Sequence, residues 1–250
     1  MMEMLKSIQD RRSSRGPYDP GRPISKQDLA QILEAGRWTP TAHNMQNYEV
    51  IVVDDRKLLD EIGNIRRPVS EVFIRENYEL LSFSEEELRR KKVGILGTMF
   101  PPSWRKPGVK IEQVIAEGGD SPQVGMLKTS PVLLVVVYDP RKRAPASEGD
   151  FLGIMSLGCL MENLWLMANS LGIGLQILSA LSEGGMQDEM KRILKIPEPL
   201  RIAFTARLGY AIPTPMKLLR VRRDIADFTH RNQFGNYDRG EISSPLERRG

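Results

Sequence analysis

The sequence predicts an α+β protein in which helices cover both faces of one mixed β-sheet. Stretches with helical and with strand periodicity alternate along the chain, and the apolar run VLLVVVY at 132–138 is typical of a strand buried on both faces. No glycine fingerprint GxGxxG follows the first predicted strand, although a parallel dinucleotide-binding domain would require one. These observations favour a three-layer architecture over a dinucleotide-binding domain.

Each element has its own signal in the sequence. Apolar residues one helical turn apart predict a short first helix that ends at the basic residues 11–15. Ser25 and Asp28 have the spacing of a capping box, which predicts a second helix from there to about Trp38. The later elements are expected in this order: strand 48–55, helix 55–65, strand 130–140, long helix 150–171, strand or loop 173–181, amphipathic helix 186–196 and strand 201–211.

Two segments differ from the rest of the single domain that is expected over residues 1–250. Residues 64–128 combine a charged helical run with a Pro/Gly-rich loop and have little apolar content, so we expect an insertion or lid there. Residues 216–250 are expected to form a C-terminal arm. The long helix is apolar on nearly every side, and polar residues interrupt it, which predicts a core helix and not a membrane span.

The composition argues against several function classes. The net charge is +4, from 36 Lys and Arg against 32 Asp and Glu, and no nucleic-acid-binding motif is present, so no nucleic-acid partner is expected. His43 and His230 have no partners at metal-ligand spacing, so no metal site is expected. The single cysteine, Cys159, is expected to be a buried thiol. The N-terminus lacks the apolar region of a signal peptide, and a cytoplasmic location is expected.

Three polar segments are candidates for a binding site. The first is RRSSR at 11–15, which a second basic group at 220–223 could join around one phosphate, because arginine offers two parallel donors to phosphate oxygens. A solvated basic surface is the alternative. The second is the loop 39–47, either a helix-ending loop with local hydrogen bonds or a polar rim around a planar heterocycle. The third is 169–183, a buried strand after a glycine that ends the helix, whose backbone N–H groups could also face a ligand.

In order and spacing, these segments resemble the FMN-dependent nitroreductase family over most of the chain apart from 64–128. The family pattern R-R-S-x-R/K is similar to residues 11–15, and part of A-P-S-x-x-N-x-Q-P-W is similar to residues 39–46. The pattern N-L-x-L-x-A-x-x-L-G-x-G resembles residues 163–174, and L-G-Y-P resembles residues 208–211. The resemblance implies a three-layer α-β-α fold with a mainly antiparallel central sheet and a long core helix. It also implies a domain-sharing homodimer with two FMN sites at the interface.

The resemblance also implies roles for individual residues. Arg11, Arg12 and Ser13 would hold the phosphate and ribityl chain of FMN, and Arg15 would reach the pyrimidine edge of the ring. The late phosphate ligands would be Arg220 and Arg222. The contacts from the second polar segment, contributed across the interface, would be Thr39, Pro40, Thr41, Asn44 and Gln46. The contacts along the flavin, with a backbone N–H near N5, would be Ile177, Leu178, Ser179 and Ala180.

The implied activity is a ping-pong oxidoreduction. NADH or NADPH would deliver hydride to flavin N5 and leave. A nitroaromatic, quinone or related electron-poor acceptor would then bind where the nicotinamide had been and be reduced. No catalytic side chain is needed, because the cofactor carries the chemistry and Arg15 supplies electrostatic support.

Two alternatives to this activity stay open. In a specialised member, such as a reductive dehalogenase or an ene-reductase, Phe100, Trp104 and Arg105 of the lid would bind the substrate. That region could instead be an arm that covers the interface. A non-catalytic flavin-binding protein is the other alternative.

Overall fold

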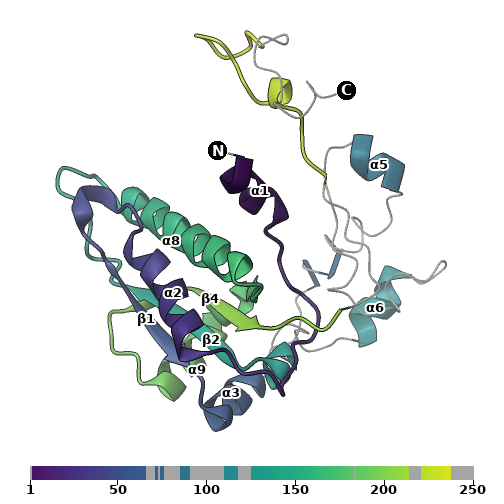
Figure 1. The fold of residues 1–250 in the computed structure, drawn as a ribbon, viewed down its shortest axis with the longest axis vertical. Helices are drawn as coiled ribbons and strands as arrows, with labels where there is room; N and C mark the ends of the chain where they lie inside the picture. The colour runs from purple at the N-terminus through teal and green to yellow at the C-terminus, as the bar shows by residue number, and fades with distance from the viewer. Residues whose placement is uncertain are drawn as a thin grey trace. The chain divides into compact units, whose positions relative to one another are not determined.

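The computed structural model describes residues 2–65, 71–72, 74–75, 85–90, 110–117, 125–182, 184–213 and 221–237 (Figure 1). The chain divides into two units. The first comprises Met1–Val69 and Gly118–Pro215, and the second comprises Ser70–Glu117 and Met216–Gly250. The first unit contains the sheet and the three polar segments 11–15, 39–47 and 169–183.

The sheet of the first unit has four strands in the order β1-β2-β4-β3. Their bounds are β1 Tyr48–Val53, β2 Val132–Tyr138, β3 Gly174–Ile177 and β4 Arg201–Gly209. Every pairing among them is antiparallel, with Val50 opposite Val136 and Leu175 opposite Leu208, and a bulge interrupts the β2–β4 register after Val136. The expectation of a mixed sheet is therefore wrong for the named strands. The parallel component among the described residues is one isolated bridge, Ser13 to Leu175.

The central strand β2 faces two separate cores. Leu133, Val135 and Val137 pack into one hydrophobic cluster, and the alternate residues of the strand pack into the other. Successive side chains of a strand point to opposite faces, so an apolar run without alternation fits a strand that is covered twice. The burial on both faces that the sequence predicted for this strand is confirmed.

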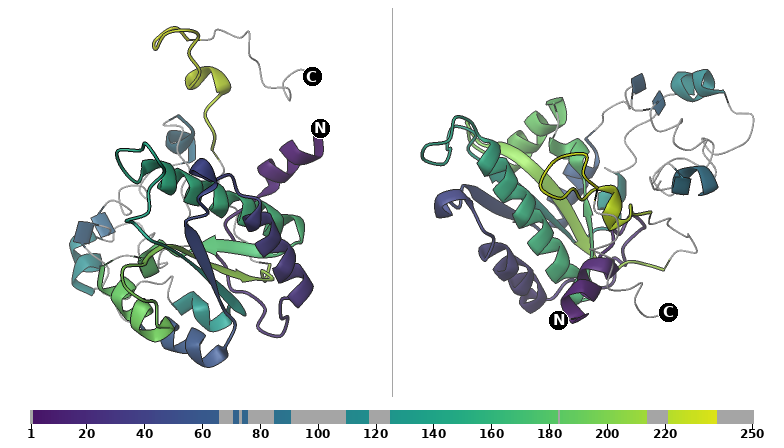
Figure 2. Two further views of the ribbon diagram at one scale, coloured as in Figure 1. Left: turned by 90° about the vertical axis from the view of Figure 1, so that its left-hand side faces the viewer. Right: turned by 90° about the horizontal axis from the view of Figure 1, so that it is seen from above.

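Helices form a layer on each side of the sheet, as the left view of Figure 2 shows. The helices α2 (Lys26–Arg37) and α8 (Phe151–Ser170) pack on one face through Ile32, Leu160 and Leu164. The helices α3 (Arg56–Gly63) and α9 (Gly184–Leu194) pack on the other. The three-layer α-β-α arrangement is confirmed. The structure also describes the helices α1 Met2–Asp10, α5 Glu85–Arg90 and α6 Ile111–Glu117, and the 3-10 turns η1 Ala42–Asn44, η3 Met126–Thr129, η4 Ser179–Ser182 and η5 Ile225–Asp227.

Side-chain caps begin two of these helices. The Ser25 hydroxyl accepts a hydrogen bond from the backbone N–H of Asp28 at 2.9 Å, as the sequence pattern predicted. The Asp55 carboxylate accepts one from Leu58 N–H at 2.9 Å and caps α3.

The long helix α8 is buried on one side only, although the sequence predicted a core helix. Its buried residues, which include Leu157, Leu160 and Leu164, form one stripe against the sheet. The opposite side exposes large apolar side chains, with Phe151 70% and Met155 52% exposed. Among the described helices, α8 alone is long and apolar enough to cross a membrane by length and composition. The helix is therefore a core helix on one face only.

Cys159 is a second correction on α8. Its thiol was expected to be buried, but it is exposed. Its neighbours Gly158 and Met155 are exposed as well, so the apolar surroundings seen in the sequence lie on the open side of the helix.

Candidate functional site

The basic segment, residues 11–18, lies along the outer edge of β3. Ser13 forms the parallel bridge with Leu175, and the N–H of Ser14 donates to the Leu175 carbonyl at 3.0 Å. The segment thus adds a short length of backbone to the edge strand of the sheet.

Two glycines of the sheet allow this close approach. A Cβ at Gly174 would lie 2.6 Å from the Ser14 hydroxyl oxygen, and one at Gly209 would lie 2.5 Å from Cδ2 of the Tyr18 ring. Real Cβ atoms do not come so near to other heavy atoms, so both positions need glycine for packing. The glycine of the L-G-Y-P-like motif is thereby explained by the tyrosine that covers it.

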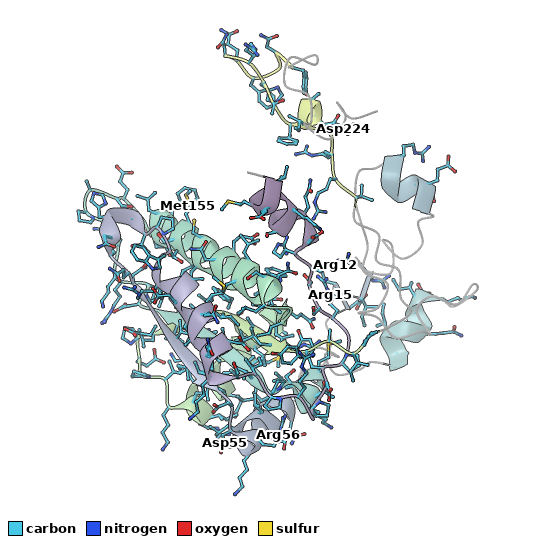
Figure 3. The ribbon with its side chains drawn as sticks, viewed as in Figure 1. Arg12, Arg15, Asp55, Arg56, Met155 and Asp224 are labelled. Atoms are coloured by element: carbon cyan, nitrogen blue, oxygen red, sulfur yellow. The ribbon has the colours of Figure 1, made fainter. Side chains whose placement is uncertain are left out.

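Arg11 and Arg12 are held by the last turns of α8. The guanidinium of Arg11 lies 4.3 Å from the centre of the Trp165 ring and makes an ion pair with Glu162 at 3.2 Å. The indole N–H of Trp165 donates to the Arg12 carbonyl at 3.0 Å. The backbone of Arg12, which Figure 3 labels, is thus anchored while its side chain is exposed.

Arg15 lies further along the same segment (Figure 3) and is half-buried. Burial lowers the pKa of its guanidinium from the ordinary value, because a low-dielectric environment disfavours the cation. An anionic or electron-rich group beside Arg15 would therefore stabilise its charged form.

The polar loop 39–47 is fixed by α2, by α8 and by its own side chains. The Asn163 amide donates to the Thr39 hydroxyl at 3.2 Å, and the N–H of Ala42 donates to the Ser156 hydroxyl at 3.1 Å. Within the loop, the Gln46 N–H donates to the Thr41 hydroxyl and the Gln46 amide donates to Asn44 Oδ1, both at 3.1 Å.

The same loop carries backbone strain. His43, Asn44 and Gln46 have φ angles of 50°, 53° and 45°, in the left-handed region that favours glycine. Such conformations cost free energy and concentrate at binding sites. Pro40, Asn44 and Gln46 are exposed and Thr41 is half-buried.

The third segment turns out of the sheet at the end of β3. Leu178 is fully buried in the core cluster with α3 and α9, and its N–H donates to the Thr205 carbonyl at 2.9 Å. The side chain and the N–H of Leu178 are therefore engaged within the fold, and the contact of segment 177–180 with the flavin stays a prediction. Ile177 and Ala180 are half-buried, and Ser179 is exposed at the start of η4.

Arg222, one of the predicted phosphate ligands, is exposed and belongs to the second unit, where its guanidinium donates to the Val221 carbonyl at 2.8 Å. The predicted site residues outside the described part of the chain are Arg220, Phe100, Trp104 and Arg105.

Sequence reasoning missed the residues that hold the site together. Arg207 binds the basic segment from β4, while Glu162 and Trp165 bind it from α8. A cation inside the otherwise apolar strand pattern of 201–209 was the one available signal, because Lys and Arg are rarely buried without a partner.

Comparisons with known proteins agree with this architecture. A profile described as the Nitroreductase family matches residues 8–210. A protein of Archaeoglobus fulgidus, provisionally named an NADH dehydrogenase/NAD(P)H nitroreductase, is 25% identical over 210 residues, covering 84% of this chain and 86% of that protein.

Solved structures share the fold. An FMN-dependent nitroreductase from Clostridium difficile has a TM-score of 0.58 at 18% identity, covering 92% of this chain and 99% of its own. A nitroreductase with bound FMN from Bacteroides fragilis has a TM-score of 0.55 at 21% identity, covering 88% of this chain and 95% of its own. A nitroreductase with bound FMN from Desulfitobacterium hafniense has a TM-score of 0.53 at 24% identity, covering 89% and 95%. With a family match over most of its length and the same fold, the chain belongs to the nitroreductase family of oxidoreductases.

Proposed function

We propose that this protein is an FMN-dependent oxidoreductase that uses NADH or NADPH to reduce nitroaromatic, quinone or related electron-poor acceptors. The observation that carries the proposal is the pairing of the basic segment with β3. Through the Ser13–Leu175 bridge, residues 11–15 lie next to the strand that ends at Ile177. A phosphate-binding donor set and the backbone expected beside a flavin ring are thus adjacent in one chain.

The donor set of this segment fits FMN. Arg12 and Ser13 offer a cationic fork and a hydroxyl to phosphate and ribityl oxygens, and Arg11 adds a second cation while it keeps Glu162 and Trp165 as neighbours. Arg15 is half-buried and would lie against the pyrimidine edge of the ring. Bound FMN would supply the redox chemistry, which is hydride transfer through N5.

Arg15 would act by electrostatics. A fixed cation in a partly dry site stabilises negative charge on the reduced ring, a contribution of about 3 kcal/mol by comparison with other preorganised donors. The preceding residue, Ser14, packs on Gly174 and donates its N–H to Leu175 of β3, which fixes the backbone beside Arg15. Little reorganisation is therefore needed when negative charge develops on the ring.

We also propose that two chains share each site. The loop 39–47 begins beside Asn163 of α8, which binds Thr39, but Ala42 contacts the helix at Ser156. The Arg12 carbonyl is bound at Trp165, roughly 14 Å from Ser156 along the helix axis. The loop therefore runs away from Arg12 of its own chain after Thr39, which favours a second chain as the source of Thr41, Asn44 and Gln46. A second copy, packed on the exposed apolar side of α8, would supply them.

The same pairing would cover apolar surface that is otherwise open. Phe151, Ile154 and Met155 on α8 are 70%, 49% and 52% exposed, and Trp38 at the end of α2 is 73% exposed. Large exposed apolar side chains that follow one another along one side of a helix, as on α8, favour a protein interface.

Flavin content tests the proposal directly. Purified protein should show flavin absorption bands, gain thermal stability when FMN is added, and oxidise NADH or NADPH in the presence of a nitroaromatic or a quinone. A colourless protein that FMN does not stabilise would refute the cofactor. A flavin-loaded protein without NAD(P)H oxidation would be a non-catalytic flavin carrier.

A further inference from the structure

Arg207 is a fully buried cation near the end of β4. Its Nε donates to Gln176 Oε1 at 2.8 Å. Its Nη2 donates to the carbonyls of Ser14 at 3.0 Å and Gly16 at 2.6 Å. Its Nη1 donates to the Ser130 hydroxyl at 3.3 Å and the Met126 carbonyl at 3.4 Å. No carboxylate is among these partners in the described part of the chain.

The surroundings of this guanidinium compensate for its burial. Removing a cation from water costs several kcal/mol, and neutral acceptors offset that cost only when the donors are satisfied. Five acceptor oxygens surround the guanidinium, and the Tyr18 ring lies 4.1 Å from it and adds a cation–π contact. An apolar side chain would fill this position without the desolvation cost. Arginine differs from an apolar side chain in the five hydrogen bonds by which it fixes the groups around it.

Those groups bracket one residue. The carbonyls of Ser14 and Gly16 stand on either side of Arg15, and both accept from the same nitrogen of Arg207. The Ser14 carbonyl also accepts from the Tyr18 hydroxyl at 3.1 Å. It belongs to the same peptide group as the N–H of Arg15, so these two donors also polarise that N–H.

The same guanidinium also binds β3, through Gln176. Gln176, which is itself buried, precedes Ile177 at the point where the strand ends. One rigid guanidinium therefore joins the backbone around Arg15 to the last residues of β3.

We infer that Arg207 is a positioning residue that fixes Arg15 relative to the end of β3, the two elements expected on either edge of the flavin ring. This inference rests on the proposed function. It gives Arg207 no contact with the cofactor and no part in phosphate binding, which Arg12 would serve from the exposed side of the segment.

A double-mutant cycle tests the inference, with the FMN dissociation constant of the full chain as its readout. The variants are Arg207→Lys, Arg15→Ala, Arg12→Ala and the doubles that combine Arg207→Lys with each of the others. Lysine keeps the buried charge but cannot reach both carbonyls and Gln176 at once. We expect Arg207→Lys to weaken FMN binding about tenfold both alone and in the Arg12→Ala background, but less than about twofold in the Arg15→Ala background.

A merely structural role would give another pattern. Equal losses in the Arg15→Ala and Arg12→Ala backgrounds, or no loss in the single variant, would overturn the inference. If Arg207→Lys does not fold by circular dichroism, Tyr18→Phe replaces it in the same cycle, since it removes one donor from the Ser14 carbonyl. An unchanged dissociation constant in Tyr18→Phe would then overturn the inference. Absence of FMN binding by the unmodified protein is a different result, because it refutes the proposed function itself.

Discussion

The ring of Tyr18 covers Gly209 so closely that a single added methyl group would lie 2.5 Å from its Cδ2 atom. Tyr18 is fully buried, and its backbone pairs with Ala211 just beyond the strand. The end of the basic segment is therefore docked on β4 by a contact that only glycine permits.

Replacing Gly209 by alanine should displace this ring. We expect a loss of about 1–3 kcal/mol in the free energy of unfolding, as is usual when atoms are added to a packed interior. Urea denaturation of the two proteins measures it. Gly149→Ala is the matched control, because nothing lies within 4 Å of a Cβ there. Equal stabilities of Gly209→Ala and the unmodified protein would show that Tyr18 moves without cost.

Replacing Arg12 by alanine should weaken the binding of FMN and spare that of riboflavin, which lacks the phosphate. The loss of a charge-assisted hydrogen bond corresponds to about 10- to 100-fold in the dissociation constant. Flavin fluorescence titration with both ligands measures the difference. Arg37→Ala is a control, since that exposed arginine is bound to Glu34 on the surface of α2. Equal losses for FMN and riboflavin would contradict a phosphate contact.

Replacing Met155 by glutamate should separate the proposed dimer. Figure 3 labels this residue on α8, where it is 52% exposed. An unpaired charge at the centre of an interface costs about 3 kcal/mol or more, so the variant should elute as a monomer and retain less flavin. Light scattering coupled to gel filtration gives the mass. Asp188→Lys, on the exposed side of α9, should leave the mass unchanged, and a dimeric Met155→Glu protein would rule out this face.

Asp139 should make the stability depend on pH. Hydrogen bonds from the Arg141 guanidinium, at 3.0 and 2.8 Å, lower the pKa of its carboxyl from 3.8 to about 2. Because the folded-state pKa is the lower one, the stabilisation is complete above the unfolded-state pKa and is lost as pH falls from about 4 to about 2. The difference in free energy of unfolding between the protein and Asp139→Asn should therefore shrink over that range. A difference that stays constant with pH would contradict the ion pair.

Much of the fold was predictable because its signals are local. The cap at Ser25, the apolar run 132–138 and the helical period of α9 each depend on residues within a few positions of one another. The segments named from the sequence as binding candidates also proved to be structured, with the loop 39–47 strained and residues 11–15 paired to β3.

The tertiary structure decided matters that involve distant segments. Leu178 and Ser179 are neighbours in one candidate motif, yet the first is buried and the second exposed, because the chain turns between them to begin η4. The open face of α8, with Cys159 on it, could not be read from a helix that is apolar all round.

By itself, the sequence determined the order of the elements, the layers they form and the family pattern, since periodicity, caps and motifs are properties of short stretches. Only the tertiary structure decided which residues hold the site. Arg207 reaches Ser14 across 193 positions of chain, and whether a buried cation is satisfied depends on carbonyls that the sheet brings to it.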